Sequence, residues 1–221
     1  MKDDTFFVLD FDRTLCDTSL VMHQFEEFLR DDYSELAAQL HATREQIEQT
    51  GGSFDVMTVL SDVKGISIED ILSRFVEKET GKTAYFLPGA QLLLHAITEA
   101  GSRWGIMTYG GEDWQRTKLR LLGFDDSSAI ILSKKGKGAQ IASWKEVEGY
   151  RLPVIFGSGI VERIVLVDDK AVEFTGLPEE SQGYLLRANA DDALLLSQRG
   201  DVAFNIMVVH DLDEVIVHEQ L

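Results

Sequence analysis

The stretch Thr5-Phe6-Phe7-Val8-Leu9-Asp10-Phe11-Asp12-Arg13-Thr14-Leu15 decides the fold of this chain. Its first five residues are strand formers, and two acids follow where this apolar run ends. Burying an unpaired charge is costly, so we expect Asp10 and Asp12 to lie at the end of a buried strand. In open α/β sheets this edge is where ligands bind. The alternative is that the two acids cap a helix or lie in a solvated turn.

Length and charge limit the classes of function. The chain has 221 residues, of which 44% are hydrophobic and 27% charged, with a net charge of −17. These values predict one large domain, or a core with a sizeable insert. The acidic balance argues against nucleic-acid and anionic-membrane partners, although a local metal or lysine can still admit an anionic small molecule.

The chain start and the cysteine content predict a cytoplasmic protein. Residues 1–7, MKDDTFF, do not resemble a signal peptide, and no apolar run is long enough to span a bilayer. Cys16 is the only cysteine, which excludes an internal disulfide and fits a reducing compartment. Although Cys16 is close to Asp10, we interpret it as a packed side chain, because no sequence neighbour would activate its thiol.

The remaining chain alternates between strands and helices, except for a helical stretch near the start. Apolar residues recur with helical spacing between residues 18 and 83, and Ser67 with Asp70 predicts a helix start there. Further strands are predicted at 103–108, 129–132, 163–169, 183–187 and 203–209. Further helices are predicted at 89–100, 112–122, 138–148 and 211–218. This alternation predicts a Rossmann-like α/β fold, a parallel sheet with helices on both faces.

The predicted strand ends carry the chemistry. The first ends at Asp10, the second at Thr108, and the strand at 163–169 ends at Asp168 and Asp169, while lysines follow the strand at 129–132. Crowded carboxylates repel, and oxygen ligands of this kind suit Mg²⁺. A hydroxyl, backbone N–H groups and a lysine bind phosphate oxygens. The set therefore predicts phosphoryl transfer. Gly157-x-Gly159 lacks the third glycine and the setting of a nucleotide loop.

The order DFDRTL, IMTYGG, a lysine and VLVDDK resembles the haloacid dehalogenase superfamily over residues 5–187. The resemblance implies an α/β core domain at 1–17 and 84–221, with an all-helical cap domain of the C1 type inserted at 18–83. It also implies that substrate selectivity lies on the cap.

The same resemblance implies residue roles. Asp10 would be the nucleophile and Asp12 the general acid and base. Asp10, the backbone carbonyl of Asp12, and Asp168 would hold Mg²⁺. The phosphate would be bound by the residues of the second strand end and by one lysine: Thr108, Tyr109, Gly110 and Lys137.

Some positions depart from the family pattern or stay open. The family usually has glycine where this chain has Arg13, whose side chain could reach the cap or a substrate anion, or simply be solvated. The family often has Lys-Pro where this chain has Lys137-Gly138. We choose Lys137 because it directly precedes a helix, with Lys134 and Lys135 as alternatives. We expect three further residues to contact the metal ligands rather than the metal itself: Thr14, Arg13 and Asp169.

The predicted function is hydrolysis of a small phosphorylated metabolite with Mg²⁺. A phosphomutase would use the same acids, and a catalytically silent phospho-ligand-binding protein would keep the same fold. A dehalogenase is disfavoured because such relatives lack the second acid that Asp12 supplies here. Neither the substrate nor the oligomeric state can be predicted from this sequence.

Overall fold

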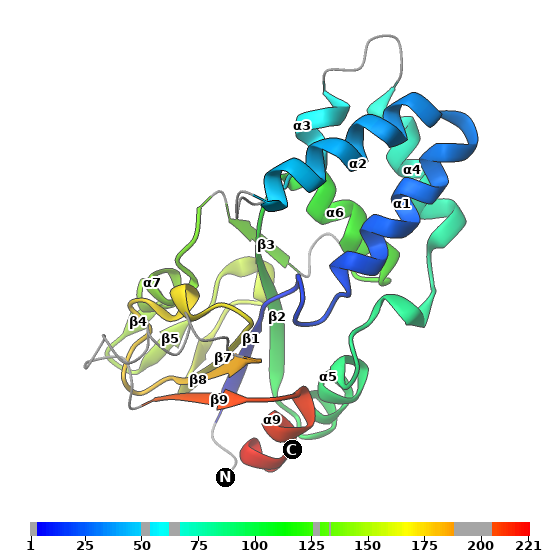
Figure 1. The fold of residues 1–221 in the computed structure, drawn as a ribbon. Coiled ribbons are helices and arrows are strands. Elements are labelled where there is room, and N and C mark those ends of the chain that lie inside the picture. The colour runs from blue at the N-terminus through cyan, green and yellow to red at the C-terminus, as the bar shows by residue number, and fades with distance from the viewer. Residues whose placement is uncertain (1–3, 50–53, 62–66, 126–128, 133, 188–204) are drawn as a thin grey trace. The chain divides into compact units, whose positions relative to one another are not determined.

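The computed structural model describes residues 4–49, 54–61, 67–125, 129–132, 134–187 and 205–221 (Figure 1). The chain divides into two compact units. One comprises Met1–Cys16, Phe86–Tyr109 and Ser127–Leu221, and the other Asp17–Tyr85 and Gly110–Asp126. We call them the α/β unit and the helical unit. No helix in the described ranges has the length and apolar character needed to cross a membrane.

The α/β unit is built on a six-stranded sheet in which every neighbouring pair is parallel, with the order β3-β2-β1-β7-β8-β9. The strands are β1 (Thr5–Leu9), β2 (Arg103–Tyr109), β3 (Ala129–Leu132), β7 (Arg163–Asp168), β8 (Gln182–Leu186) and β9 (Ile206–Val209). The predicted α/β fold with a parallel sheet is confirmed. The predicted strand at 203–209 includes Ala203 and Phe204, which lie outside the described residues.

The register of the central strands brings their acidic ends together. Leu9 of β1 pairs with Ile106 of β2 on one side and with Val167 of β7 on the other. The N–H of Asp10 donates to the carbonyl of Val167 at 2.9 Å. Asp10 and Asp168 therefore leave adjacent parallel strands at the same level, at the carboxyl edge of the sheet.

Both faces of the sheet are covered, because side chains of each strand alternate between them. Phe6 and Val8 of β1 share a buried cluster with Ile141 and Phe174. The latter two belong to the short helices α7 (Lys137–Ala142) and η4 (Ala171–Phe174). Helices α5 (Ala90–Glu99) and α9 (Leu212–Glu219) pack together on the opposite face (Figure 1). This covering explains why β1 is buried along its whole length.

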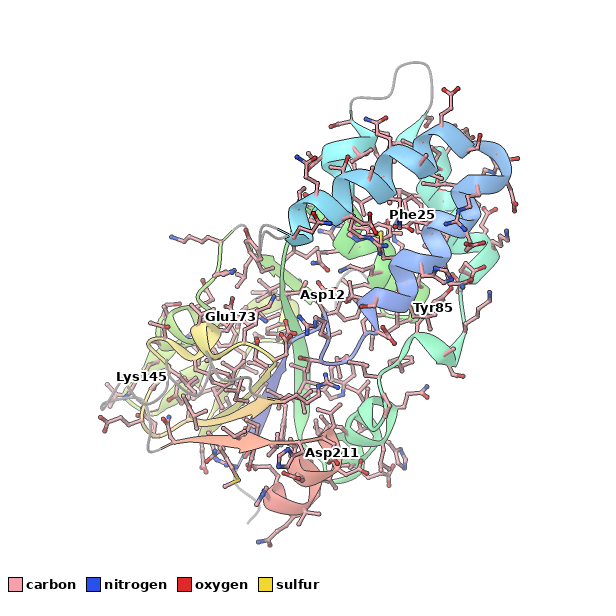
Figure 2. All side chains as sticks on the ribbon, viewed as in Figure 1. Asp12, Phe25, Tyr85, Lys145, Glu173 and Asp211 are labelled. Atoms are coloured by element: carbon pink, nitrogen blue, oxygen red, sulfur yellow. The ribbon has the colours of Figure 1, made fainter. Side chains whose placement is uncertain are left out.

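The helical unit has its own aromatic core. Its helices are α1 (Thr18–Asp32), α2 (Ser34–Gln49), α3 (Val56–Leu60), α4 (Ile68–Glu79), η1 (Thr83–Tyr85) and α6 (Glu112–Leu121). The Oγ of Ser67 accepts the N–H of Asp70 at 3.2 Å and caps α4. Phe25, labelled in Figure 2, lies 4.9 Å from Phe75 and 5.0 Å from Trp114 between ring centroids. Because Trp114 belongs to this core, α6 lies in the helical unit, outside the predicted range 18–83.

The predicted helix at 138–148 is wrong beyond residue 142. Instead, a three-stranded sheet follows, made of β4 (Lys145–Glu146), β5 (Gly149–Arg151) and β6 (Ile160–Val161), with η3 (Val154–Phe156) before β6. Lys145 and Glu146 pair antiparallel with Tyr150 and Gly149, which a helix through residue 148 would not allow. Gly149 follows the predicted helix, has φ of +138°, and lies with its backbone against the carbonyl of Val161. Trp144 and Tyr150 are buried in the same cluster as Phe6 and Val8 of β1.

We expect Gly149→Ala to lower the free energy of unfolding by about 2–4 kcal/mol, because of its backbone conformation and the added contact. A Cβ at residue 149 would lie 2.3 Å from the carbonyl oxygen of Val161. Gly157→Ala is the matched control, since Gly157 has φ of +86° but open space where a Cβ would lie. The control should cost about 1 kcal/mol in urea unfolding. Equal costs for the two variants would contradict the close approach at Gly149.

Candidate active site

A tight loop links β1 to the site. The carbonyl of Phe11 accepts from the N–H groups of Leu15 and Cys16 at 3.0 and 2.9 Å, and the N–H of Arg13 donates to the carbonyl of Cys16 at 2.9 Å. This turn places Arg13 at φ of +64°, in the left-handed region that favours glycine. The family's usual glycine suits this backbone conformation, whereas the arginine of this chain adopts it with backbone strain.

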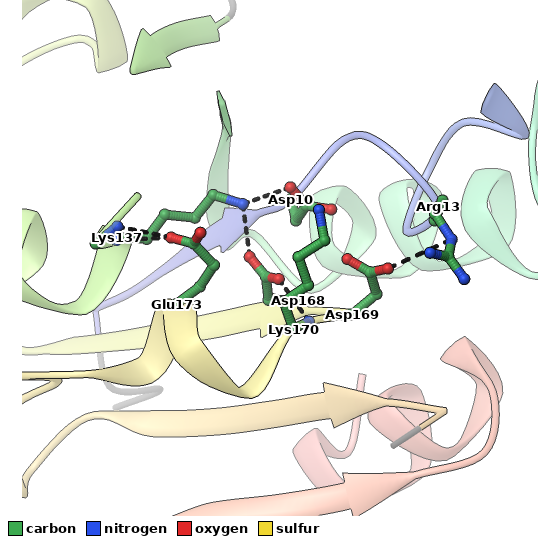
Figure 3. Close-up of polar contacts among 8 residues, drawn as sticks. Asp10, Arg13, Lys137, Asp168, Asp169, Lys170 and Glu173 are labelled. Atoms are coloured by element: carbon green, nitrogen blue, oxygen red, sulfur yellow. Dashed lines mark hydrogen bonds and ion pairs between the residues drawn. The ribbon is translucent and has the colours of Figure 1, made fainter. Parts of the chain in front are cut away.

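Lys137 joins the two acidic strand ends. Its Nζ donates to Oδ1 of Asp10 and, at 2.5 Å, to Oδ2 of Asp168 (Figure 3). All three side chains are buried. The other carboxylate oxygen of Asp168, Oδ1, accepts the N–H of Lys170 at 2.8 Å. A buried charge without a partner costs several kcal/mol, so each member of this group depends on the others.

Burial and charge act in opposite directions on this group. Burial would lower the pKa of the Lys137 ammonium, but the carboxylates of Asp10 and Asp168 outweigh it and raise that pKa above its usual value. Burial raises the pKa of the Asp168 carboxyl, and the charge of Lys137 opposes that rise. The lysine therefore stays charged, and it favours the ionised form of the acid beside it.

The acidic cluster fits a hard divalent cation. Asp10, Asp168 and Asp169 each offer a carboxylate oxygen, and these oxygens lie within 4.8 Å of one another. Oδ2 of Asp10 is buried and has no hydrogen-bond partner among the described residues. Carboxylate oxygens at this spacing are the donors that Mg²⁺ prefers. Asp169 thus lies closer to the predicted ligands Asp10 and Asp168 than the sequence suggested.

Asp169 also connects the cluster to Arg13. The Nε of Arg13 lies 3.6 Å from Oδ2 of Asp169, and the arginine side chain is 70% exposed (Figure 3). Burial, followed by the charge of Asp10, raises the pKa of Asp169 from 3.8 to about 6, while Arg13 opposes the rise. The carbonyl of Arg13 accepts from the guanidinium of Arg187, a contact for which the sequence holds no signal. Arg13 therefore lies beside the acidic cluster, paired through its side chain and its backbone.

Two hydroxyls of the predicted site are buried. Thr108 lies near the end of β2 with 1% exposure, and Thr14 follows β1 with 0% exposure. Neither Oγ1 atom has a hydrogen-bond partner within the described part of the chain. Tyr109 is the last residue of β2, and Gly110 follows it with φ of +151°, where a side chain is disfavoured. Thr108 is thus a buried donor with unused capacity on the strand next to β1.

The structure distinguishes between the three lysines that follow β3. Lys134 and Lys135 are exposed, whereas Lys137 is 2% exposed and reaches the carboxylates. The Lys-Gly sequence also has a reason, because a Cβ at Gly138 would lie 2.7 Å from the N of Leu177 and the O of Thr175. The helix that carries the lysine is therefore packed directly on the backbone that follows η4.

Two further acids lie near the site. Asp12 is half-buried in the loop after β1 and is bridged to Cys16, which is buried as predicted for a packed side chain. Its side chain does not belong to the carboxylate cluster found among the described residues.

The sequence analysis did not identify Glu173 as a residue of the site. Its Oε2 accepts the N–H groups of Gly136 and Lys137 at 2.9 and 3.1 Å (Figure 3).

The left-handed conformation of Arg13 predicts the order of two variants. Arg13→Gly should unfold with about 1 kcal/mol more free energy than Arg13→Ala, because both lose the exposed ion pair and only glycine relieves the strain. Urea unfolding of the two proteins measures this difference. The same pair at Arg30, within α1, should show the reverse order, since glycine weakens a helix. Equal stability of the two variants at residue 13 would contradict the strain.

The raised pKa of Asp169 predicts that the free energy of unfolding depends on pH when a chelator removes divalent metal ions. Its pKa rises from 3.8 to about 6 on folding, so ionisation favours the unfolded chain, and stability is lost as pH increases through this window. We expect Asp169→Asn to be the more stable protein at pH 7, by up to about 3 kcal/mol, and to lose this advantage near pH 4. Urea unfolding at several pH values measures the difference. A difference that is constant from pH 4 to 7 would contradict the prediction.

The sequence and the fold of this chain both resemble those of known proteins. The family model of the haloacid dehalogenase-like hydrolases matches residues 7–138. A search of curated proteins gave no match. Among solved structures, the chain is similar to a haloacid dehalogenase-like hydrolase from Burkholderia xenovorans, with 17% identity and a TM-score of 0.60 over 97% of this chain and 98% of that one.

Two further structures show the same fold. A phosphoserine phosphohydrolase-like protein from Francisella tularensis has 12% identity and a TM-score of 0.52 over 97% of this chain and 99% of that one. The HAD-hydrolase YfnB from Bacillus subtilis, bound to magnesium, has 11% identity and a TM-score of 0.51 over 100% of both chains. With the family model matching more than half of its residues, this chain belongs to the haloacid dehalogenase-like hydrolase family.

Proposed function

We propose that this protein is a Mg²⁺-dependent phosphohydrolase that acts on a small phosphorylated metabolite through an aspartyl-phosphate at Asp10. The surroundings of the Asp10 carboxylate carry the proposal. The ammonium of Lys137 lies between Asp10 and Asp168, and the second oxygen of Asp10 is buried without a partner among the described residues. A carboxylate held in this way can act as a nucleophile, and the lysine offsets charge that would repel a phosphate dianion.

The proposed metal ligands are oxygens alone. Asp10, the backbone carbonyl of Asp12, and Asp168 would hold Mg²⁺, with Asp169 as a further donor directly or through water. When bound, the ion would neutralise charge on the carboxylates and on the phosphoryl group. Support comes from the carboxylate spacing and from the unpartnered oxygen of Asp10.

The proposed reaction has two steps. An oxygen of Asp10 attacks phosphorus, the bond from phosphorus to the ester oxygen breaks, and Asp12 gives its proton to the leaving oxygen. In the second step, Asp12 takes a proton from a water molecule. This water attacks phosphorus, the bond from phosphorus to Asp10 breaks, and phosphate leaves. Asp12 lies two residues beyond Asp10, on the tight loop that follows the strand.

The phosphate would be held by groups at the end of β2 and by the lysine that begins α7. Thr108 offers a buried hydroxyl, Tyr109 and Gly110 offer backbone N–H groups, and Lys137 offers its ammonium. Such donors stabilise charge on a transferring phosphoryl group.

We further propose that residues 18–83 form the cap domain that selects the substrate. We also propose that the protein acts in the cytoplasm without nucleic-acid or membrane partners.

Hydrolysis of a generic aryl phosphate tests the proposal. We expect phosphate release that needs Mg²⁺, stops in chelator and falls about 10⁴-fold or more in Asp10→Asn, because the amide is not a nucleophile. Asp211→Asn is the matched control. Asp211 caps α9 through Oδ1, and asparagine caps equally well. Its rate should equal that of the wild type.

The products separate the alternatives. Full activity of Asp10→Asn would overturn the mechanism. An isomerised sugar phosphate in place of free phosphate would identify a mutase. Halide release from a haloacid would identify a dehalogenase, and ligand binding without turnover across a broad phosphate panel would identify a silent binding protein.

A further inference from the structure

We propose that Glu173 is a positioning residue for Lys137, a role that rests on the proposed function. Its carboxylate lies on η4, five residues after Asp168, and it is 2% exposed. A single oxygen, Oε2, accepts the N–H of Gly136 at 2.9 Å and that of Lys137 at 3.1 Å. Gly136 is the residue directly before α7, and Lys137 is the first residue of that helix.

The Glu173 carboxylate supplies a hydrogen-bond acceptor that the start of α7 lacks. The first N–H groups of a helix have no partners within the helix. The residue before α7 is Gly136, which has no side chain to cap them. Glu173 supplies the acceptor from another segment, and a carboxylate is favoured at the positive end of a helix. The cost of burying the Glu173 carboxylate is therefore offset by two N–H donors, those of Gly136 and Lys137, which we call the lysine loop.

A second contact makes this placement rigid. Gly138 packs so closely that a Cβ there would lie 2.7 Å from Thr175 O and Leu177 N. Gly136, Lys137 and Gly138 are thus all fixed to the segment 173–177. The same segment begins directly after Asp168, Asp169 and Lys170. One short stretch of chain therefore positions both the acids and the ammonium that joins them.

The geometry predicts how Glu173 acts. The ammonium of Lys137 reaches Asp10 and Asp168 at the end of a long flexible side chain, so its position depends on where the backbone is held. If the carboxylate of residue 173 is removed, or is carried on a shorter side chain, the backbone at Lys137 shifts. The ammonium then loses its position between the carboxylates of Asp10 and Asp168. Misplacement of a catalytic group by about 1 Å can reduce the rate about 10²-fold.

Three substitutions separate position from charge. Glu173→Gln keeps an acceptor oxygen at the same reach but loses the charge. Glu173→Asp keeps the charge and shortens the side chain by one methylene. Glu173→Ala removes both. We expect kcat for aryl phosphate hydrolysis to stay within about 10-fold of the wild type in Glu173→Gln and to fall about 10²-fold in the other two. The opposite order, with Asp active and Gln impaired, would overturn the proposal.

Amide hydrogen exchange tests the contact without any turnover. The N–H groups of Gly136 and Lys137 should exchange faster in Glu173→Asp and Glu173→Ala than in the wild type, and should stay protected in Glu173→Gln. Asp211→Ala, which removes a carboxylate cap from α9, is the control and should leave these two amides and kcat unchanged. Unchanged exchange in Glu173→Asp would overturn the role of Glu173, even if the protein proves to be a phosphatase.

A double variant shows whether the effect passes through the lysine. In a Lys137→Ala background, Glu173→Asp should cause no further loss of kcat, since the group it positions is absent. An additional loss of about 10²-fold in that background would overturn the proposal. A wild-type protein that releases no phosphate would refute the proposed function, while the exchange experiment would still decide whether Glu173 holds the lysine loop.

Discussion

The ammonium of Lys137, held between the carboxylates of Asp10 and Asp168, is the interaction on which the site depends. Two buried acids this close would repel each other, and a buried lysine alone would be strongly destabilised. Together they offset one another's charge. Removing one partner from such a buried group typically costs about 3–5 kcal/mol, so the fold tolerates these three residues as a set.

The sheet and the loops bring the three residues together from distant parts of the chain. The parallel register places Asp10 and Asp168 on neighbouring strands at the same level. Lys137 comes from α7, which packs against the segment after β7 through Glu173 and Gly138. The position of the ammonium therefore depends on backbone contacts as well as on its own side chain.

Much of this arrangement was predictable from the sequence. An apolar run that stops at an acid indicates a strand end, and this pattern identified Asp10 and Asp168 together with the α/β fold. The order of the strands and helices then predicted one edge where these ends meet. The choice of Lys137 followed from its place before a helix, and in the structure it is the lysine that contacts both acids.

Other features depend on long-range contacts that no local pattern encodes. The helix predicted at 138–148 ends at Ala142, because Lys145 and Glu146 instead pair antiparallel with Tyr150 and Gly149. Helix α6 belongs to the helical unit because Trp114 packs beside Phe25, a contact between segments far apart in the sequence. Glu173 gave no signal either, because its partners are backbone N–H groups, which every residue except proline carries.

The identity of the nucleophile is the central claim of this account, and trapping the covalent intermediate tests it most directly. The protein would be mixed with an aryl phosphate and Mg²⁺, quenched in acid during turnover, digested and analysed by mass spectrometry. The account predicts one added phosphoryl group on the peptide that contains Asp10, located on that side chain. Phosphate release with no phosphorylated peptide, or with the phosphoryl group on a different residue, would contradict it.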